Sequence, residues 1–136
     1  MQKRGVMKRF VLIIIFVALL GKSVAEAYSI NKFYHNIEAV AESESSIEQI
    51  QIINYTPDGA KKNIIGTEKY NDCIEFLQSL KVKHCDNKDL YGTSKQIVIK
   101  YNDTELSVLF MGKYIIYDNI YYTIENYSGL DNILDL

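Results

Sequence analysis

The stretch that decides the fold is QIVIKYNDTELSVLFMGKYIIYDNIYYTIE, residues 96–125. It divides into four short runs rich in β-branched and aromatic residues, which favour strands. Three dipeptides separate these runs: Asn102-Asp103, Gly112-Lys113 and Asp118-Asn119. Asn, Asp and Gly tolerate the positive backbone φ that two-residue hairpin turns require. The stretch therefore predicts a four-stranded antiparallel meander.

The three turns assign side chains to the two faces of this sheet consistently, because successive residues of a strand point to opposite faces. The first face collects Ile97, Ile99, Tyr101, Leu106, Val108, Phe110, Ile115, Tyr117, Ile120, Tyr122 and Ile124. The opposite side, named the second face, is polar at one end and apolar at the other. Its apolar cluster consists of Leu109, Met111, Tyr114, Ile116 and Tyr121.

This cluster on the second face is large enough to need a cover. Two tyrosines can bury roughly 150–250 Å² each, and the largest apolar patch of a typical monomer measures about 300–600 Å². The amphipathic segment 30–41 of the chain is one candidate cover, and a partner protein is another. Partial exposure of a Tyr-rich face is the third possibility. The five residues are therefore a candidate partner surface.

Two helices are predicted outside the meander. INKFYHNIEAVA, residues 30–41, has apolar residues at helical spacing, with Ser29 as the N-cap. A second helix is expected over residues 68–80, with Thr67 as its cap. Its apolar stripe consists of Cys73, Phe76, Leu77 and Leu80, with Ile74 at its edge. This stripe is expected to pack on the first face.

A further hairpin precedes the second helix. IEQIQIINY, residues 47–55, and AKKNIIG, residues 60–66, are joined by TPDG, residues 56–59, which has strong turn chemistry. Residues 81–95 are polar and are expected to be irregular. The predicted fold class is α+β, with a mostly antiparallel sheet and one main helix packed on one face.

Residues 1–27 have the three parts of a secretory signal peptide. A basic region is followed by the apolar run 10–21 and by small residues at Ala25 and Ala27. A membrane-spanning helix needs about 20 apolar residues, and this run is shorter. We expect cleavage after Ala27, which leaves a single secreted domain over residues 28–136. The alternative is an uncleaved segment that anchors the domain to the cell envelope.

The expected mature domain is acidic. Residues 28–136 contain 16 acidic and 10 basic side chains, which gives a net charge of −6. An acidic domain is not suited to bind nucleic acid or anionic membrane surfaces. We therefore expect a protein partner, no nucleic acid, and membrane contact only through an uncleaved N-terminal segment.

The sequence contains two cysteines, Cys73 and Cys85. Export would permit a disulfide. However, a bridge needs Cα atoms about 4.4–6.8 Å apart, so the chain would have to double back after Leu80. Both a disulfide and free thiols are compatible with the sequence.

No motif with catalytic chemistry stands out. His84, Cys85 and Asp86, with Cys73, could supply metal ligands, but their spacing matches no zinc pattern. There is no G-x-S-x-G motif and no Cys–His protease signature. We expect no cofactor, no metal and no enzymatic activity. A small hydrolase is an alternative only if the fold brings His84, Cys85 and an acid together in a cleft.

The order hairpin, helix, meander, with Gly112-Lys113-Tyr114 and YYTIENYSGL at residues 121–130, resembles a family of small exported domains of unknown function from Gram-positive bacteria. The resemblance covers roughly residues 47–130. It implies an exported α+β domain and no catalytic residues. The chain departs from it by lacking a proline in the final strand and a lipid-attachment cysteine near residue 27.

The sequence thus predicts a small secreted bacterial domain without enzymatic activity, which binds or inhibits another protein through the Tyr/Ile-rich second face. The alternative function is an accessory or sensor domain that an uncleaved N-terminal segment holds at the envelope.

Overall fold

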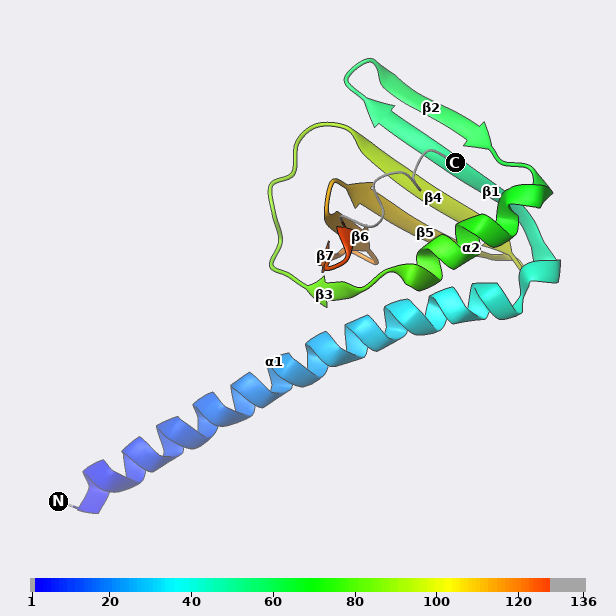
Figure 1. Ribbon diagram of the computed structural model, residues 1–136. Helices are drawn as coiled ribbons and strands as arrows, with labels where there is room; N and C mark the ends of the chain where they lie inside the picture. The colour runs from blue at the N-terminus through cyan, green and yellow to red at the C-terminus, as the bar shows by residue number, and fades with distance from the viewer. Residues whose placement is uncertain (1, 128–136) are drawn as a thin grey trace.

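The computed structural model describes residues 2–127, without the side chains of residues 2–12 and Phe16. Its elements are α1 (Gln2–Glu42), β1 (Ile47–Thr56), β2 (Gly59–Ile64), α2 (Tyr70–Ser79), β3 (Val82–His84), β4 (Ser94–Tyr101), β5 (Thr104–Met111), β6 (Tyr114–Tyr117) and β7 (Ile120–Ile124), with short 3₁₀ turns at Glu44–Ser46 and Thr67–Lys69. In this part of the chain, seven strands form one sheet in the order β2-β1-β4-β5-β6-β7-β3 (Figure 1). All neighbours are antiparallel, which confirms the predicted α+β class.

The meander has the predicted turns and register. Both residues of the first and third turns have positive φ, at 47° and 56° for Asn102-Asp103 and at 51° and 61° for Asp118-Asn119. In the second turn, Gly112-Lys113, only Gly112 has a positive φ, at 55°. This fits a two-residue turn with glycine in its first central position. The pairs Ile99–Leu106, Phe110–Ile115 and Tyr117–Ile120 all lie opposite each other. The first and second faces are therefore separated as the sequence predicts.

The N-terminal hairpin is also confirmed, and it joins the meander because β1 pairs with β4. The prediction that residues 81–95 are irregular is wrong at both ends. Val82–His84 forms β3, which pairs with β7, and β4 already begins at Ser94. A strand of three residues has too little periodicity to be predicted, since its partner strand decides where it forms.

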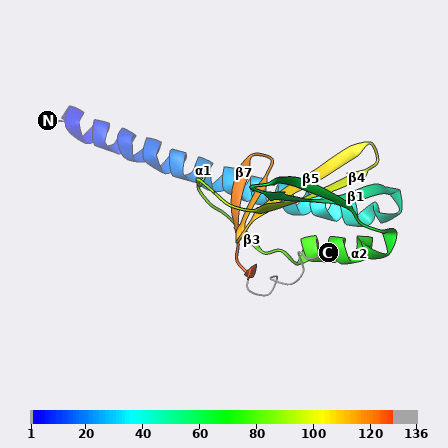
Figure 2. The same cartoon turned by 90° about the horizontal axis from the view of Figure 1, so that it is seen from above.

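Both helices lie on the first face, so the prediction that segment 30–41 covers the second face is wrong. The Phe33 ring of α1 lies 5.2 Å from Tyr117 and 5.6 Å from Tyr122, between ring centroids. The Phe76 ring of α2 lies 5.6 Å from Phe110. Because the sheet has seven strands and twists strongly (Figures 1 and 2), α2 covers only one part of it, and α1 fills the part formed by β6, β7 and β3.

The helix starts differ from the predicted caps. α1 runs through Ser29, whose hydroxyl donates a hydrogen bond to the Glu26 carbonyl at 2.9 Å, so Ser29 is not an N-cap. Thr67 makes no capping hydrogen bond either; a 3₁₀ turn over Thr67–Lys69 leads into α2. The predicted apolar stripe is confirmed: Cys73, Ile74, Phe76 and Leu77 of α2 are buried, and so is Leu80, which directly follows the helix.

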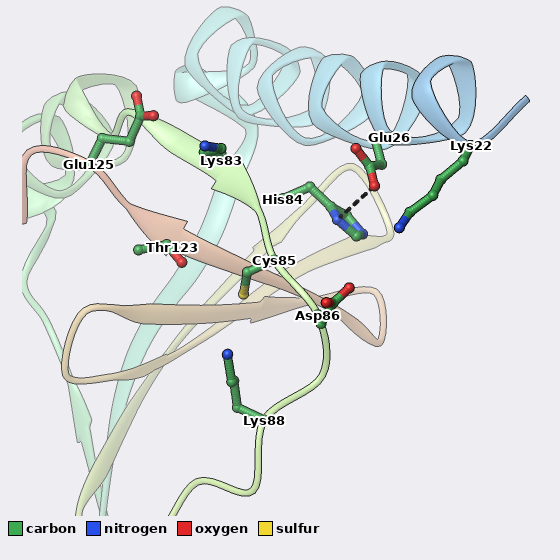
Figure 3. A pocket seen from close by; sticks show the side chains of 9 residues that line it. All are labelled: Lys22, Glu26, Lys83, His84, Cys85, Asp86, Lys88, Thr123 and Glu125. Carbon is green, nitrogen blue, oxygen red and sulfur yellow. Dashed lines mark ion pairs between the residues drawn. The ribbon is translucent and has the colours of Figure 1, made fainter. Parts of the chain in front are cut away.

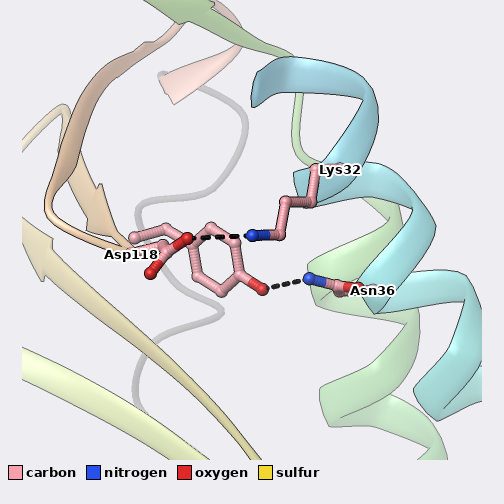
Figure 4. Close-up of polar contacts among 4 residues, drawn as sticks. Lys32, Asn36 and Asp118 are labelled. Carbon is pink, nitrogen blue, oxygen red and sulfur yellow. Dashed lines mark hydrogen bonds and ion pairs between the residues drawn. The ribbon is translucent and has the colours of Figure 1, made fainter. Parts of the chain in front are cut away.

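Polar contacts tie the C-terminal part of α1 to the sheet and to α2. The Lys32 ammonium lies 3.1 Å from the Asp118 carboxylate, and this contact raises the pKa of Lys32. The Asn36 amide donates a hydrogen bond to the Tyr117 hydroxyl (Figure 4). At the β3 edge, the Val82 N–H donates to the Tyr34 hydroxyl at 3.0 Å. This part of α1 is therefore an integral layer of the domain.

The N-terminal part of α1 extends away from the domain (Figure 1). Its described apolar side chains are largely exposed to solvent: Ile13, Ile14, Ile15, Val17, Leu19, Leu20, Val24 and Tyr28. By length and composition, the segment Ile13–Glu42 meets the requirement for a membrane-crossing helix, a test that signal sequences also meet.

Replacing Phe33 with alanine tests whether α1 belongs to the core. We expect Phe33→Ala to lower the free energy of unfolding by about 3–5 kcal/mol, because the fully buried ring would leave a cavity. The matched control is Tyr28→Ala, one and a half turns earlier and 68% exposed, with an expected change below about 0.5 kcal/mol. Urea unfolding of the full chain in mild detergent measures both; equal losses would contradict the packing.

Candidate functional site

The apolar cluster of the second face lies on two adjacent rows across the sheet. The pairing places Ile53, Gln96, Leu109, Ile116 and Tyr121 side by side on β1, β4, β5, β6 and β7. Cys85 continues the row, because its N–H donates to the Tyr121 carbonyl at 3.0 Å. A second row beside it holds Met111, Tyr114, Thr123 and Lys83. The structure thus brings all five predicted surface residues together.

All five predicted residues of the second face are half-buried, although both α1 and α2 pack on the first face. Met111 and Tyr114 lie directly opposite each other, as do Leu109 and Ile116. Cross-strand neighbours at this spacing pack against one another. The result is a partly exposed surface whose side chains are held by their neighbours, and segment 30–41 does not cover it.

Charged and polar groups border this cluster. The Lys113 ammonium lies 5.5 Å from the centroid of the Tyr114 ring, within reach of a cation–π contact. On the side of β1, the Tyr55 hydroxyl donates to Gln96 at 2.7 Å, and the Gln96 amide donates to Ser107. An apolar centre with a polar rim is the usual anatomy of a protein interface.

Sequence reasoning missed two members of this surface. Ile53 belongs to it because β1 joins β4, and it is buried with 6% of its surface exposed. Cys85 belongs to it because it follows β3 at the sheet edge. Ile53 breaks the alternation of Ile50, Gln51 and Ile52, and an apolar residue on the same face as Gln51 was a signal for it. No local pattern identifies Cys85.

A second feature is a polar pocket of about 560 Å³ where α1 passes the end of β3 (Figure 3). Its lining residues are Lys22, Glu26, Lys83, His84, Cys85, Asp86, Lys88, Thr123 and Glu125. The His84 imidazole points to α1, with its Nδ1 atom 3.5 Å from the Glu26 carboxylate, and it contacts the Tyr122 ring edge-on. Burial raises the pKa of the Tyr122 hydroxyl, and a hydrogen bond with Ser29 partly opposes this.

The pocket does not assemble a catalytic dyad from His84 and Cys85. The two side chains leave the chain on opposite sides of the sheet and point apart in Figure 3. Within residues 2–127, no hydrogen bond joins them, and no group of three His, Cys, Asp or Glu side chains is placed to hold a metal ion. The arrangement therefore adds no support to the hydrolase alternative.

Both cysteines are free thiols. Cys73 is on the core-facing side of α2, where burial raises its pKa to about 12. Cys85 is partly exposed at the pocket. The sequence left open whether the two cysteines form a disulfide. In the structure they do not, because Cys73 faces the core on the first face and Cys85 lies on the side of the second face.

Comparison with known proteins gives no relative: no family model, no curated protein and no solved structure matches this chain. The resemblance to exported Gram-positive domains therefore stays a prediction. Part of the motif that carries it, residues 128–130, lies outside the described residues.

The two thiols are expected to react very differently with a thiol reagent. At pH 8, roughly one Cys73 side chain in ten thousand is ionised when its pKa is about 12, and it is fully buried. Native protein should therefore bind one equivalent of iodoacetamide, at Cys85, and denatured protein two. Mass spectrometry of the labelled peptides gives the count. If neither cysteine is labelled without reductant but both are labelled after reduction, the two form a disulfide, and the structure is contradicted.

Proposed function

We propose that this chain is a small exported domain, without enzymatic activity, that binds another protein through the second face of its sheet. The observation that carries the proposal is the position of the two helices, which cover the first face and leave the Tyr/Ile cluster half-buried. The signal-like residues 1–27 support export.

The chemistry of this surface favours a protein partner. Tyrosine and methionine are enriched in the apolar centre of protein interfaces, and here Met111, Tyr114 and Tyr121 are held in place by cross-strand neighbours. Side chains that are ordered before binding lose less conformational entropy in the complex. The net charge of −6 over residues 28–136 disfavours nucleic acid as the ligand.

A specific observation also supports the second candidate, a domain held at the membrane by an uncleaved N-terminal segment. α1 is a single helix from Gln2 to Glu42, and the bond after Ala27 lies inside it. The exposed apolar part of α1 follows Lys3, Arg4, Lys8 and Arg9. Basic residues at this end favour an orientation with the N-terminus in the cytoplasm and the domain outside.

Alanine substitutions at neighbouring positions of β7 and β6 test the role of the second face. Tyr114→Ala with Tyr121→Ala should abolish capture of the partner from the native extracellular medium, while costing only about 1 kcal/mol of stability per site. Tyr122→Ala is the matched control, because the adjacent Tyr122 is fully buried on the first face, and its loss should cost about 3–5 kcal/mol.

Two results decide this test. Capture of the same protein by the double variant would refute the proposed surface. A loss of several kcal/mol in the double variant, measured by thermal and urea unfolding, would show that the two tyrosines are core residues.

The mass of the protein isolated from its native source separates the two candidates. Cleavage at the predicted site gives a chain that begins at Tyr28 and is found in the medium. Retention gives the full 15.7 kDa chain in the membrane fraction. If the domain is secreted, as we propose, the shorter chain is expected. The full-length mass would instead support the membrane-held form.

A further inference from the structure

The polar pocket between α1 and β3 adjoins one end of the proposed partner surface, because Lys83, Cys85 and Thr123 belong to both. Its charged lining is balanced in sign. Three ammonium groups line it, from Lys22, Lys83 and Lys88. Three carboxylates also line it: Glu26, Asp86 and Glu125. Of these six side chains, Glu26 has the His84 ring as a partner, with the His84 Nδ1 atom 3.5 Å from its carboxylate. In the described part of the chain, the other five make no ion pair.

The position of this pocket along α1 relates it to the membrane-held form of the protein. Lys22 comes directly after the apolar run 10–21, and Glu26 follows one turn later on the same helix. If α1 crosses a bilayer, the long Lys22 side chain would extend to the headgroup level. The pocket would then open at the layer of lipid headgroups, directly beside the exposed apolar side chains of α1.

We propose that this pocket binds the headgroup of a zwitterionic phospholipid that carries a phosphate and a primary ammonium. The phosphate would accept hydrogen bonds from lysine ammonium groups that line the pocket, those of Lys22, Lys83 and Lys88, and the ligand's ammonium would donate hydrogen bonds to the carboxylates of Asp86 and Glu125. The inference rests on the second candidate function, retention of α1 in the membrane. Headgroup binding would fix the orientation of the domain on the bilayer.

Charge complementarity selects this headgroup over an anionic one. A purely anionic headgroup would find no partner for Asp86 and Glu125 and would be repelled by them. A zwitterion can satisfy both signs of charge at once. The volume of about 560 Å³ leaves room for such a headgroup with bridging water.

Native mass spectrometry of the full chain in mild detergent tests the proposal. Phosphatidylethanolamine, phosphatidylglycerol and phosphatidylcholine with identical acyl chains are added separately. We expect phosphatidylethanolamine to be retained about tenfold more than phosphatidylglycerol, a difference of about 1.4 kcal/mol. Phosphatidylcholine should also be retained less, because its quaternary ammonium cannot donate a hydrogen bond. Soluble phosphoethanolamine should compete only weakly, since it lacks the acyl chains that lie against α1.

Two variants give the comparison at the level of residues. Lys22→Gln combined with Lys83→Gln and Lys88→Gln should remove the lipid preference. Lys61→Gln with Lys62→Gln, in the exposed edge strand β2 at the opposite end of the sheet, should keep it. Circular dichroism shows whether the triple variant and the control variant fold. If the triple variant does not fold, Lys22→Gln alone replaces it, because Lys22 lies in the exposed part of α1.

Several results would overturn the inference. These are equal retention of the three lipids, a preference for phosphatidylglycerol, an unchanged preference in the triple variant, or phosphoethanolamine binding as tightly as the lipid. Each is measured on the full chain. A native protein that begins at Tyr28 would instead refute retention in the membrane, so the two failures are distinguishable.

Discussion

Burial of one face of a seven-stranded sheet is the constraint on which the rest of this structure depends. The first face is apolar from β1 to β7, and a ten-residue helix, α2, is too short to cover it. The C-terminal part of α1 supplies the missing cover, through Phe33, Ile37 and Val40. With both helices committed to this face, the described chain presents the second face to its surroundings.

The same packing makes α1 serve two roles along its length. Its C-terminal part is a layer of the domain, joined to β6 by Asn36 and to the turn before β7 by Lys32. Its N-terminal part exposes aliphatic side chains and lies beyond the sheet. In the proposed secreted form, cleavage after Ala27 would remove Lys22 and Glu26 from the polar pocket and leave the core residues of α1 in place. In the membrane-held form, the helix would connect domain and bilayer without a flexible linker.

The parts of the fold that could be predicted from the sequence are those in which local chemistry sets the geometry. Turn residues such as Asn102-Asp103 require positive φ, and each turn then sets the register and the face of every side chain that follows. The five residues of the candidate surface were found in this way. Contacts between segments that are far apart in the sequence could not be predicted. Val82–His84, for example, forms a strand only because it pairs with β7. Segment 30–41 is amphipathic in either arrangement, so its choice of face depended on the unpredicted width of the sheet.

The most direct test of this account locates the Phe33 ring relative to the sheet. NMR spectra of the protein with labelled aromatic residues should show contacts from Phe33 to Tyr117 and Tyr122, whose ring centroids lie 5.2 and 5.6 Å away. Contacts from Phe33 to Tyr114 and Tyr121 instead would place α1 on the second face. The Tyr/Ile cluster would then be part of the core, and the proposed partner surface would not exist.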